Sequence, residues 1–539
     1  MLLHAAFREQ CRIRPDRTAI VAGAQDITYA GLARRVASFE RLLQAYGVRQ
    51  GDRVVVYLDS SIEFAVAVHA VLGIGAVFVP VSPLTRSEKL AYMLDDLRAV
   101  ALVTDTGLAA QWSGPRRRCA SVRVCVVCGA GTPPDTVPWP ADEADTSLVD
   151  SPADRSVDPS VDPSADPTAH PLAAVPDTAL AAVIYTSGTT GVPKGVMLSH
   201  RNMCAAWRSV QSYLQLRDDD VIGLALSPAF SYGLYHLLMG LGIGATLVLE
   251  RSAAFPARLV ERLAQLRVTV FPGVPTLFSA ILGLGHLARL DLSSIRLLTN
   301  AAAALSEHHI RQLQKVFPQA VLMSMYGMTE CKRISYLPPE QLALRPTSVG
   351  RGMPGQDHWL VDTQGRRLPP GATGELVVHG DHVMQGYWDK PAETAARLRA
   401  GPAGTELHTG DIFRTDAEGW LYFVARSDDI IKSRGEKVAP REVENVIYGI
   451  DGVLDCAVMG VPDDALGQAV VAVVALRPQV QLTERDVIRH CLQHLESYMA
   501  PKRVLFRDNL PRTDSGKIRK VDLRHLFMVP ADGGPAAAA

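Results

Sequence analysis

The sequence contains few cysteines, no long apolar run and almost no net charge. Eight cysteines among 539 residues are too few for the disulfide framework of a small secreted protein. No run of about 18 apolar residues is present, so no membrane-spanning helix is expected. The 55 Lys and Arg nearly cancel the 56 Asp and Glu, which argues against a nucleic-acid or anionic-membrane partner. Arg8 and Glu9 come too early for the apolar core of a signal peptide, and we therefore expect a cytoplasmic protein.

Three of the cysteines lie close together in the sequence. Cys119, Cys125 and Cys128 have the spacing C-x5-C-x2-C, which could begin a zinc site. No second Cys/His pair follows nearby to complete four ligands, and the segment 121–128 is rich in valine. A buried strand that accommodates small thiols is therefore favoured over a metal site.

The length of the chain allows three or four structural units at roughly 100–200 residues each. Strand and helix patterns alternate at the start of the chain and again over 181–325, which predicts α/β architecture with mostly parallel sheets covered by helices. Short strands between Gly and Pro turns then predict a barrel-like, β-rich subdomain. The predicted organisation is a large N-terminal domain, 1–426, with the β-rich subdomain at 348–425; a small α+β C-terminal domain, 428–528; and a frayed tail, 529–539.

A repetitive insertion interrupts the large domain. Ser156-Val157-Asp158-Pro159 recurs as Ser160-Val161-Asp162-Pro163 and as Ser164-Ala165-Asp166-Pro167. Because proline donates no backbone N–H and the segment has few apolar side chains, 148–176 is predicted to be a disordered, solvated loop. The alternating pattern resumes after this segment, so it is an insertion within a domain rather than a boundary between domains.

The most specific motif is a glycine- and hydroxyl-rich run. It reads Tyr185-Thr186-Ser187-Gly188-Thr189-Thr190-Gly191-Val192-Pro193-Lys194-Gly195 and lies between two apolar strand patterns. The glycines permit close backbone approach, the hydroxyls and backbone N–H groups can cradle phosphate oxygens, and Lys194 adds a positive charge. The pattern G-x4-G-K-[ST] is absent, so this is not a Walker A loop. We interpret the run as a phosphate-binding loop rather than a surface turn.

This run resembles the phosphate-binding loop of the adenylate-forming superfamily, which includes acyl-CoA synthetases, peptide-synthetase adenylation domains and firefly luciferase. Further motifs follow in the order of that family, so the resemblance extends over nearly the whole chain and is greatest to the acyl-CoA ligase-like members. These motifs are Tyr326-Gly327-Met328-Thr329-Glu330, Leu407-His408-Thr409-Gly410-Asp411, Arg426 to Val438, and Pro511 to Ile518.

The resemblance implies that the chain binds ATP with Mg²⁺. Glu330 suits Mg²⁺ where phosphates supply other ligands, Thr329 can donate to an α-phosphate oxygen, and Tyr326 offers a flat face to adenine. A core tyrosine beside a glycine turn is the alternative for Tyr326. By resemblance, Asp411 accepts the ribose hydroxyls and Arg426 supports it. The other nucleotide-binding residues expected are Thr186, Ser187, Gly188, Thr189, Thr190, Gly191, Lys194, Asn300, Ala301, Ala302 and Gly327.

The last motif places Lys517 in a Thr-Asp-Ser-Gly loop. A solvated surface lysine is the simple alternative, but the resemblance implies that Lys517 reaches the α-phosphate and the carboxylate during adenylation only. Asp428 matches the hinge position of the family. Rotation about this hinge would replace the Lys517 face of a mobile C-terminal domain by a face carrying Lys432, Gly435 and Lys437, which completes the second half-reaction in family members.

The expected acyl pocket differs from that of many relatives. Phe230-Ser231-Tyr232-Gly233 stands where many family members carry an aromatic residue followed by His, and where amino-acid-activating members carry an Asp. Without that Asp, an α-ammonium group would lack its counter-charge in a dry pocket. Gly273 and Met325 belong to the remaining expected lining, which is apolar. We therefore expect a fatty or aryl carboxylic acid without charge on its tail, and not an α-amino acid.

The predicted activity is ATP-dependent formation of an acyl-adenylate with release of pyrophosphate, followed by acyl transfer to a thiol, most often that of coenzyme A. The phosphopantetheine thiol of an acyl carrier protein and an amine remain alternative acceptors. A catalytically inactive nucleotide- or acyl-binding protein is a further alternative, although Glu330, Asp411 and Lys517 would be the first residues lost in such a protein. A dinucleotide-binding loop at 240–244 is disfavoured because its glycine spacing is wrong.

Overall fold

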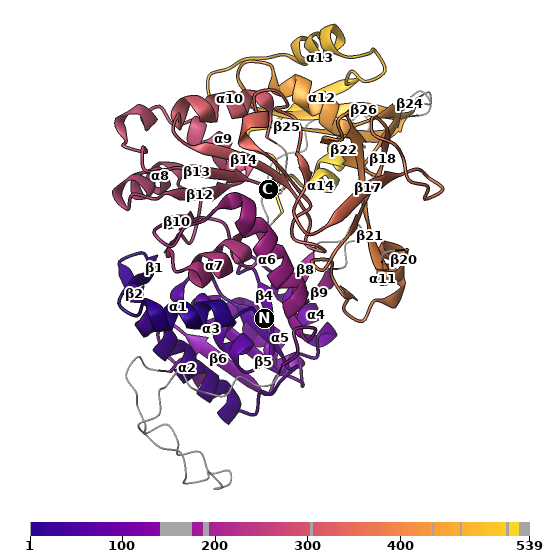
Figure 1. Ribbon diagram of the computed structural model, residues 1–539. Coiled ribbons are helices and arrows are strands. Elements are labelled where there is room, and N and C mark those ends of the chain that lie inside the picture. The colour runs from indigo at the N-terminus through magenta and orange to yellow at the C-terminus, as the bar shows by residue number, and fades with distance from the viewer. Residues whose placement is uncertain are drawn as a thin grey trace, which may run out of the picture.

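The computed structural model describes most of the chain, and Figure 1 follows it from the N-terminus to the C-terminus. The predicted insertion at 148–176 lies almost entirely outside the described residues, and the predicted tail at 529–539 lies entirely outside them. The described residues are 2–140, 175–186, 193–301, 305–402, 404–427, 429–433, 436–463, 466–513 and 517–527.

An eight-stranded sheet carries the two strands that flank the predicted phosphate loop. Its order is β19-β9-β8-β4-β3-β5-β6-β7. The strands from β8 to β7 run parallel to their neighbours, whereas β9 is antiparallel to both β8 and β19. The strands are β3 (Arg53–Tyr57), β4 (Val77–Val81), β5 (Ala101–Asp105), β6 (Val124–Cys128), β7 (Val137–Pro138), β8 (Leu180–Thr186), β9 (Lys194–Ser199) and β19 (Gly386–Tyr387).

A nine-stranded sheet has the order β16-β15-β14-β13-β12-β10-β11-β1-β2. Its central strands are parallel, so β12, β13 and β14 end at the same edge of the sheet. The register pairs Gly273 with Asn300, and Asn300 with Ser324. The strands are β1 (Thr18–Ala22), β2 (Gln25–Thr28), β10 (Val221–Leu224), β11 (Thr246–Leu249), β12 (Val270–Gly273), β13 (Leu297–Asn300), β14 (Val321–Tyr326), β15 (Ser335–Leu337) and β16 (Arg351–Gly352).

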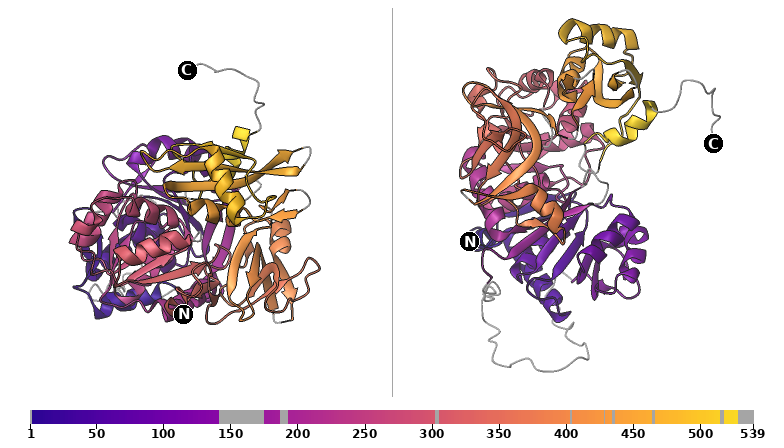
Figure 2. Two further views of the ribbon diagram at one scale, coloured as in Figure 1. Left: turned by 90° about the horizontal axis from the view of Figure 1, so that it is seen from above. Right: turned by 90° about the vertical axis from the view of Figure 1, so that its right-hand side faces the viewer.

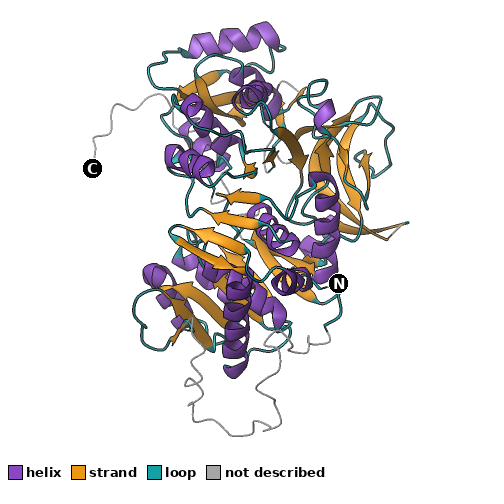
Figure 3. Ribbon diagram, turned by 60° about the vertical axis from the view of Figure 1, so that its left-hand side comes forward, coloured by secondary structure: helices purple, strands orange, loops and turns teal. Residues whose placement is uncertain are grey.

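Helices cover both sheets (Figure 3). Helix α3 is apolar on all sides, and a helix of this kind is expected to be buried. Ten of its residues are buried, and nine of these belong to a core that strands of both sheets share. Its N-terminus is capped by Ser61, whose side chain accepts the N–H of Phe64. The helices are α1 (Ala5–Ile13), α2 (Tyr29–Ala45), α3 (Ile62–Gly73), α4 (Ser87–Asp96), α5 (Ala109–Arg118), α6 (His200–Leu214), α7 (Ser231–Ile243), α8 (Pro256–Gln265), α9 (Pro275–Leu282) and α10 (Glu307–Val316).

Most of the predicted β-rich segment forms a five-stranded antiparallel sheet, whereas its short strands β16 and β19 join the other two sheets. The order of the five-stranded sheet is β17-β18-β21-β20, and β22 pairs with the other half of the long strand β21. A short helix, α11 (Pro391–Arg397), precedes β20. The strands are β17 (Asp357–Val361), β18 (Thr373–His379), β20 (Leu398–Gly401), β21 (Gly404–Thr415) and β22 (Leu421–Arg426).

The C-terminal part is a smaller α+β unit that lies against α9, α10 and β22 (Figures 1 and 2). Ser279 in α9 donates to the carbonyl of Leu454 at 3.5 Å, and the rings of His309 and Tyr448 are 6.0 Å apart. Its sheet has the order β24-β23-β26-β25, with β27 beside β26, and apolar clusters lie on both faces. The predicted fold class is therefore confirmed. The elements are β23 (Ile431–Ser433), β24 (Glu436–Val438), α12 (Pro440–Tyr448), β25 (Val453–Asp463), β26 (Gly467–Leu476), α13 (Glu484–His494), β27 (Arg503–Phe506) and α14 (Lys520–Arg524).

Three alternatives that the sequence disfavours are a zinc site, a dinucleotide-binding loop and a membrane-spanning helix. The valine-rich segment forms β6, Cys125 is buried there, and the described residues contain no group of His, Cys, Asp and Glu arranged for a metal ion. Gly240 and Gly242 lie inside α7, rather than in a turn between a strand and a helix. Among the helices of the described residues, none is long and apolar enough to cross a membrane.

Candidate active site

The centre of the site is Asp411, which lies between two sheets. Asp411 in β21 faces Arg426 in β22 across the antiparallel register, and Arg426 Nε lies 3.4 Å from Asp411 Oδ1. Tyr326, the last residue of β14, donates its hydroxyl to Asp411 Oδ2. The ring of Tyr326 also packs edge-on against Phe413, with 4.8 Å between the ring centroids. Three residues predicted for the ribose and the adenine therefore meet in one cluster.

Asp411 is buried, and burial raises the pKa of its carboxyl group. Arg426, the Tyr326 hydroxyl, Lys517 and Arg397 act in the opposite direction and favour the carboxylate. Arg397, at the end of α11, was not predicted from the sequence. It donates to the carbonyl of His408 at 3.3 Å, and a Cβ on Gly410 would collide with its guanidinium. The glycine of the Thr-Gly-Asp motif is therefore needed for this close approach.

Glu330 lies beside the frame of the phosphate loop. It is buried, and its Oε1 accepts the hydroxyl of Tyr387 in β19 at 2.7 Å. Lys194 Nζ lies 5.7 Å from the centroid of the Tyr387 ring. Burial and the neighbouring Glu330 raise the pKa of the Tyr387 hydroxyl, which keeps it protonated as a donor. Tyr387 therefore connects Glu330 to Lys194, a link that the sequence did not indicate.

The phosphate loop itself is described only at its two ends. Thr186 and Lys194 form the last pair of the β8–β9 ladder, and Thr186 Oγ1 lies 3.5 Å from the Lys194 carbonyl oxygen. Strand β19 continues the sheet beside β9, which explains why Tyr387 lies close to Lys194. The predicted residues outside the described part are Ser187, Gly188, Thr189, Thr190, Gly191, Ala302, Asp428 and Gly435, and the side chain of Lys437.

Lys517, which belongs to the C-terminal part, interacts electrostatically with the same cluster. Lys517 is an exposed residue, yet surrounding protein and Arg426 lower the pKa of its ammonium group below the usual value. Asp411 and Glu330 act in the opposite direction. The backbone of Lys517 is bound to Thr513: its N–H donates to Thr513 Oγ1 at 3.1 Å, and its carbonyl accepts the N–H of Thr513 at 2.7 Å.

The remaining nucleotide-binding residues predicted from the sequence lie on several different elements. Asn300 and Ala301 are buried at the end of β13, and Thr329 is half-buried beside Glu330. A Cβ on Gly327 would collide with the Lys332 carbonyl oxygen, so glycine is required there. Lys432 is exposed on β23, and within the described part of the chain the structure gives its side chain no contact with the Asp411 cluster.

Comparison with known proteins identifies the chain. The model of the family described as AMP-binding enzyme matches residues 7–388, and the model of the AMP-binding enzyme C-terminal domain matches 442–517. The chain belongs to the AMP-binding enzyme family. It is 34% identical over 524 residues to a feruloyl-CoA synthase of Amycolatopsis sp., covering 96% of this chain and 97% of the relative. It is 32% identical over 532 residues to a long-chain-fatty-acid–CoA ligase of Escherichia coli O6:H1, covering 96% and 93%.

Two solved structures illustrate the range of enzymes with this fold. The anthranilate CoA ligase AuaEII, in complex with anthranoyl-AMP, is 25% identical and has a TM-score of 0.87, with 98% of this chain and 97% of that chain covered. The amide bond synthetase McbA from Marinactinospora thermotolerans is 26% identical and has a TM-score of 0.83, with 98% and 100% covered.

In this AMP-binding enzyme four of the predicted acyl-pocket residues, 230–233, lie at the start of α7, whereas Gly273 ends β12 and Met325 lies in β14. Phe230 is the N-cap residue of α7, and the Tyr232 hydroxyl lies 2.7 Å from Thr299 Oγ1 in β13. A Cβ on Gly233 would collide with the Ser227 carbonyl oxygen. The carbonyl of Ser231 accepts Lys332 Nζ at 2.9 Å. The buried side chain of Lys332, which the sequence analysis did not consider, therefore reaches this region.

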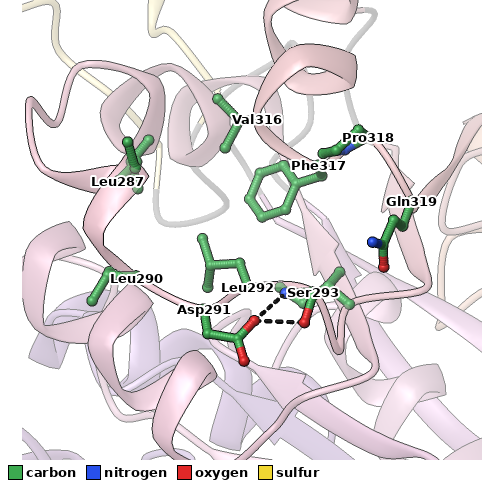
Figure 4. Close-up of a pocket in the computed structure, with 11 residues that line it drawn as sticks. Leu287, Leu290, Asp291, Leu292, Ser293, Val316, Phe317, Pro318 and Gln319 are labelled. Carbon is green, nitrogen blue, oxygen red and sulfur yellow. Dashed lines mark hydrogen bonds between the residues drawn. The ribbon is translucent and has the colours of Figure 1, made fainter.

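A surface pocket of about 220 Å³ lies elsewhere, between the segment that follows α9 and the end of α10 (Figure 4). Asp291 in this pocket accepts hydrogen bonds from the backbone and the hydroxyl of Ser293, at 3.1 and 2.5 Å. None of the predicted site residues lines the pocket. We therefore assign this pocket no part in the reaction.

Proposed function

We propose that this enzyme activates a fatty or aryl carboxylic acid with ATP and then transfers the acyl group to the thiol of coenzyme A. One observation carries the proposal: Tyr326, Asp411 and Arg426 are in contact, and the ammonium of Lys517 lies in the field of Asp411 and Glu330. Segments that are far apart in the sequence thus contribute to one charged site. The names of the feruloyl-CoA and fatty-acid–CoA relatives support the choice of reaction.

The donors of the site fit a nucleotide with its metal ion. Asp411 provides carboxylate oxygens that suit ribose hydroxyls, and the ring of Tyr326 lies directly beside it. A Mg²⁺ ion bound through one carboxylate and substrate phosphates needs only one protein ligand, and Glu330 is the carboxylate available for that. When bound, this ion would neutralise phosphate charge.

The protein groups then divide the work of adenylation. Lys194 and the loop that it follows would hold the outer phosphates, while Asp411 fixes the ribose. Lys517 would place its positive charge at the α-phosphate, where negative charge develops as the carboxylate attacks and pyrophosphate leaves. We propose that rotation about Asp428 afterwards withdraws Lys517 and presents Lys432, Gly435 and Lys437 for transfer to the thiol.

A second candidate acceptor is an amine. The structural similarity to the amide bond synthetase McbA favours this alternative specifically. A carrier-protein thiol is the third acceptor that we consider. The chain is also 29% identical to tyrocidine synthase 2 of Brevibacillus parabrevis, over a region that covers 14% of that protein.

Acid-dependent release of pyrophosphate tests the proposal. The enzyme is incubated with ATP, Mg²⁺ and a panel of fatty, aryl and amino acids, and coenzyme A, a phosphopantetheinylated carrier protein or an amine is then added. We expect pyrophosphate release with fatty or aryl acids and a thioester with coenzyme A. Release with amino acids alone would contradict the proposed substrate class, and no release with any acid would favour the inactive binding protein.

Replacing Glu330 by Gln is expected to raise the Mg²⁺ concentration needed for half-maximal activity about 10-fold, because a charged ligand becomes neutral at similar shape. Mg²⁺ titrations of pyrophosphate release measure this. Glu340→Gln is the control, because Glu340 is exposed in the short 3-10 helix after β15. An unchanged titration for Glu330→Gln would exclude Glu330 as the ligand.

The rate of adenylation is expected to fall as the pH rises. This fall should occur at a lower pH than the usual pKa of a lysine would give. The pKa of Lys517 lies below its usual value, so the ammonium loses its proton as pH rises through that lowered pKa. The profile of kcat/KM for ATP against pH reports the free enzyme. Lys517→Arg should shift the alkaline limb upward, because a guanidinium stays protonated. An identical limb in both enzymes would show that another group titrates.

A further inference from the structure

Two adjacent basic residues, Lys332 and Arg333, are buried two and three positions after Glu330. Their exposed fractions are only 2% and 3%. Among the described residues, neither forms an ion pair with an Asp or a Glu. Buried charges are normally paired, because leaving water costs free energy that a partner must offset. A guanidinium stays protonated in proteins, so the charge of Arg333 is permanent.

A tight turn directs both side chains into the protein. Lys332 has a φ of +62°, a conformation that is uncommon for residues other than glycine. The N–H of Arg333 donates to the Cys331 carbonyl at 2.7 Å, and Gly327 packs directly against the turn. Close backbone contacts therefore hold the turn, and the fold fixes the position of both residues.

The ammonium of Lys332 has partners within the protein. Its Nζ donates to the Ser231 carbonyl and lies 4.3 Å from the centroid of the Tyr235 ring. Burial and the adjacent Arg333 hold the pKa of Lys332 well below the usual value for lysine. The protein thus accommodates Lys332 by a hydrogen bond, by ring contacts and by favouring the neutral amine.

Arg333 is not satisfied in the same way. Its Cζ lies 4.7 Å from the centroid of the Tyr232 ring, and its positive charge acts against the rise that burial causes in the pKa of the Tyr213 hydroxyl. However, Nε and Nη2 are buried and have no hydrogen-bond partner in the described part of the chain. These two nitrogens share one edge of the guanidinium, the edge that binds a carboxylate through two parallel hydrogen bonds.

Arg333 lies beside residues that were predicted to line the acyl pocket. Tyr232 is one of them, and the Tyr213 hydroxyl lies 3.5 Å from Sδ of Met325, which is another. Tyr232 in turn reaches Thr299, which directly precedes Asn300 at the end of β13. A buried donor pair therefore lies among the side chains expected to hold the acyl tail, separate from the Asp411 cluster.

We propose that Arg333 binds a second carboxylate at the distal end of the acid substrate, so that the substrate is a dicarboxylic fatty or aryl acid. This inference rests on the proposed function and specifies its substrate class. A ketone oxygen at the same position also accepts hydrogen bonds but carries no full charge, and acids with such an oxygen are one arm of the test. The sequence-based expectation of an uncharged tail considered the residues around Phe230 and did not include Arg333.

The experiment compares pairs of acids of equal length in acid-dependent pyrophosphate release. Each pair has one member ending in a methyl group and one ending in a second carboxylate, in a fatty and an aryl series, with ω-keto acids as the intermediate arm. For the wild-type enzyme we expect kcat/KM to favour the dicarboxylic member about 10- to 100-fold, as for a charge-assisted hydrogen-bonded pair in a buried site.

Arg333→Met removes the donors and keeps the aliphatic stem, and it should reverse the preference in favour of the methyl-terminated acid. Arg333→Lys keeps a charge without the paired donors and should retain only part of the preference. Arg351→Met is the matched control, because Arg351 also lies over an aromatic ring, 4.1 Å from the centroid of Trp420, but is exposed. Thermal melting of each variant checks that it is folded.

The outcomes separate the inference from the proposed function. A dicarboxylic preference that Arg333→Met abolishes supports the inference. A wild-type preference for methyl-terminated or ω-keto acids overturns it while leaving the proposed activity in place, as does a preference that Arg333→Met leaves unchanged. If no acid of any series releases pyrophosphate, the proposed function itself fails.

Discussion

Lys517→Ala is expected to reduce acyl-adenylate formation about 10²- to 10³-fold while leaving thiol transfer from supplied acyl-adenylate largely intact. The reduction follows from removing a positive charge positioned where charge develops, and losses of this size are typical for one such group. Transfer is spared because the proposed rotation takes Lys517 away from the site before the thiol attacks. Rapid-quench measurement of adenylate formation and a separate thioester assay measure the two steps.

The control for this variant is Lys502→Ala. Lys502 is an exposed lysine of the same C-terminal part, at the start of β27, and it has no assigned role. It should affect neither step. If Lys517→Ala slowed both steps equally, the separation of roles between two faces of the C-terminal part would be wrong, although the adenylate-forming site could still be correct.

Asp411→Asn is expected to lower kcat/KM for ATP about 100-fold, mainly through KM. The substitution keeps the shape but removes the charge that Arg426 and Tyr326 share, and it weakens acceptance of the ribose hydroxyls. Hydrogen bonds to charged groups contribute about 1.5–3 kcal/mol each and neutral ones about 0.5–1.5 kcal/mol, so weakening two of them by roughly 1.4 kcal/mol each gives an effect of this order. Steady-state kinetics with ATP as the varied substrate measure it.

Two comparisons show whether the effect is specific to the ribose. Asp362→Asn, at an exposed turn after β17, should leave KM for ATP unchanged. 2′,3′-Dideoxy-ATP should bind the wild-type enzyme weakly and lose little further affinity in Asp411→Asn. Equal losses for ATP and the dideoxy analogue in the variant would show that Asp411 acts through folding or through Arg426 rather than on the ribose.

Much of the fold was predictable because its signals are local. Apolar strand patterns and helix patterns recur along the chain, and β6, α12 and β26 form where valine runs and amphipathic spacing indicate them. The candidate site was predictable where a short motif carries it, as for Asp411 in the Thr-Gly-Asp run. The register of β21 and β22 then explains why Arg426 faces Asp411.

The contacts that the sequence did not indicate join distant segments. Tyr387 and Glu330 are separated by 57 positions, and no spacing rule connects them. Arg333 was missed for a related reason, since a charged residue after a motif is usually solvent-exposed, and only the packing of α7 against the turn shows that it is buried. Pairing across sheets is decided by tertiary packing, which local patterns do not encode.

The central claim is that one ATP molecule contacts residues of the N-terminal sheets and Lys517 at the same time. A crystal structure with a non-hydrolysable ATP analogue and the acid substrate tests it most directly. The account predicts a single nucleotide, with adenine beside Tyr326, ribose hydroxyls on Asp411 and the α-phosphate facing Lys517. A nucleotide bound in another place, or Asp411 and Lys517 engaged by different molecules, would contradict it.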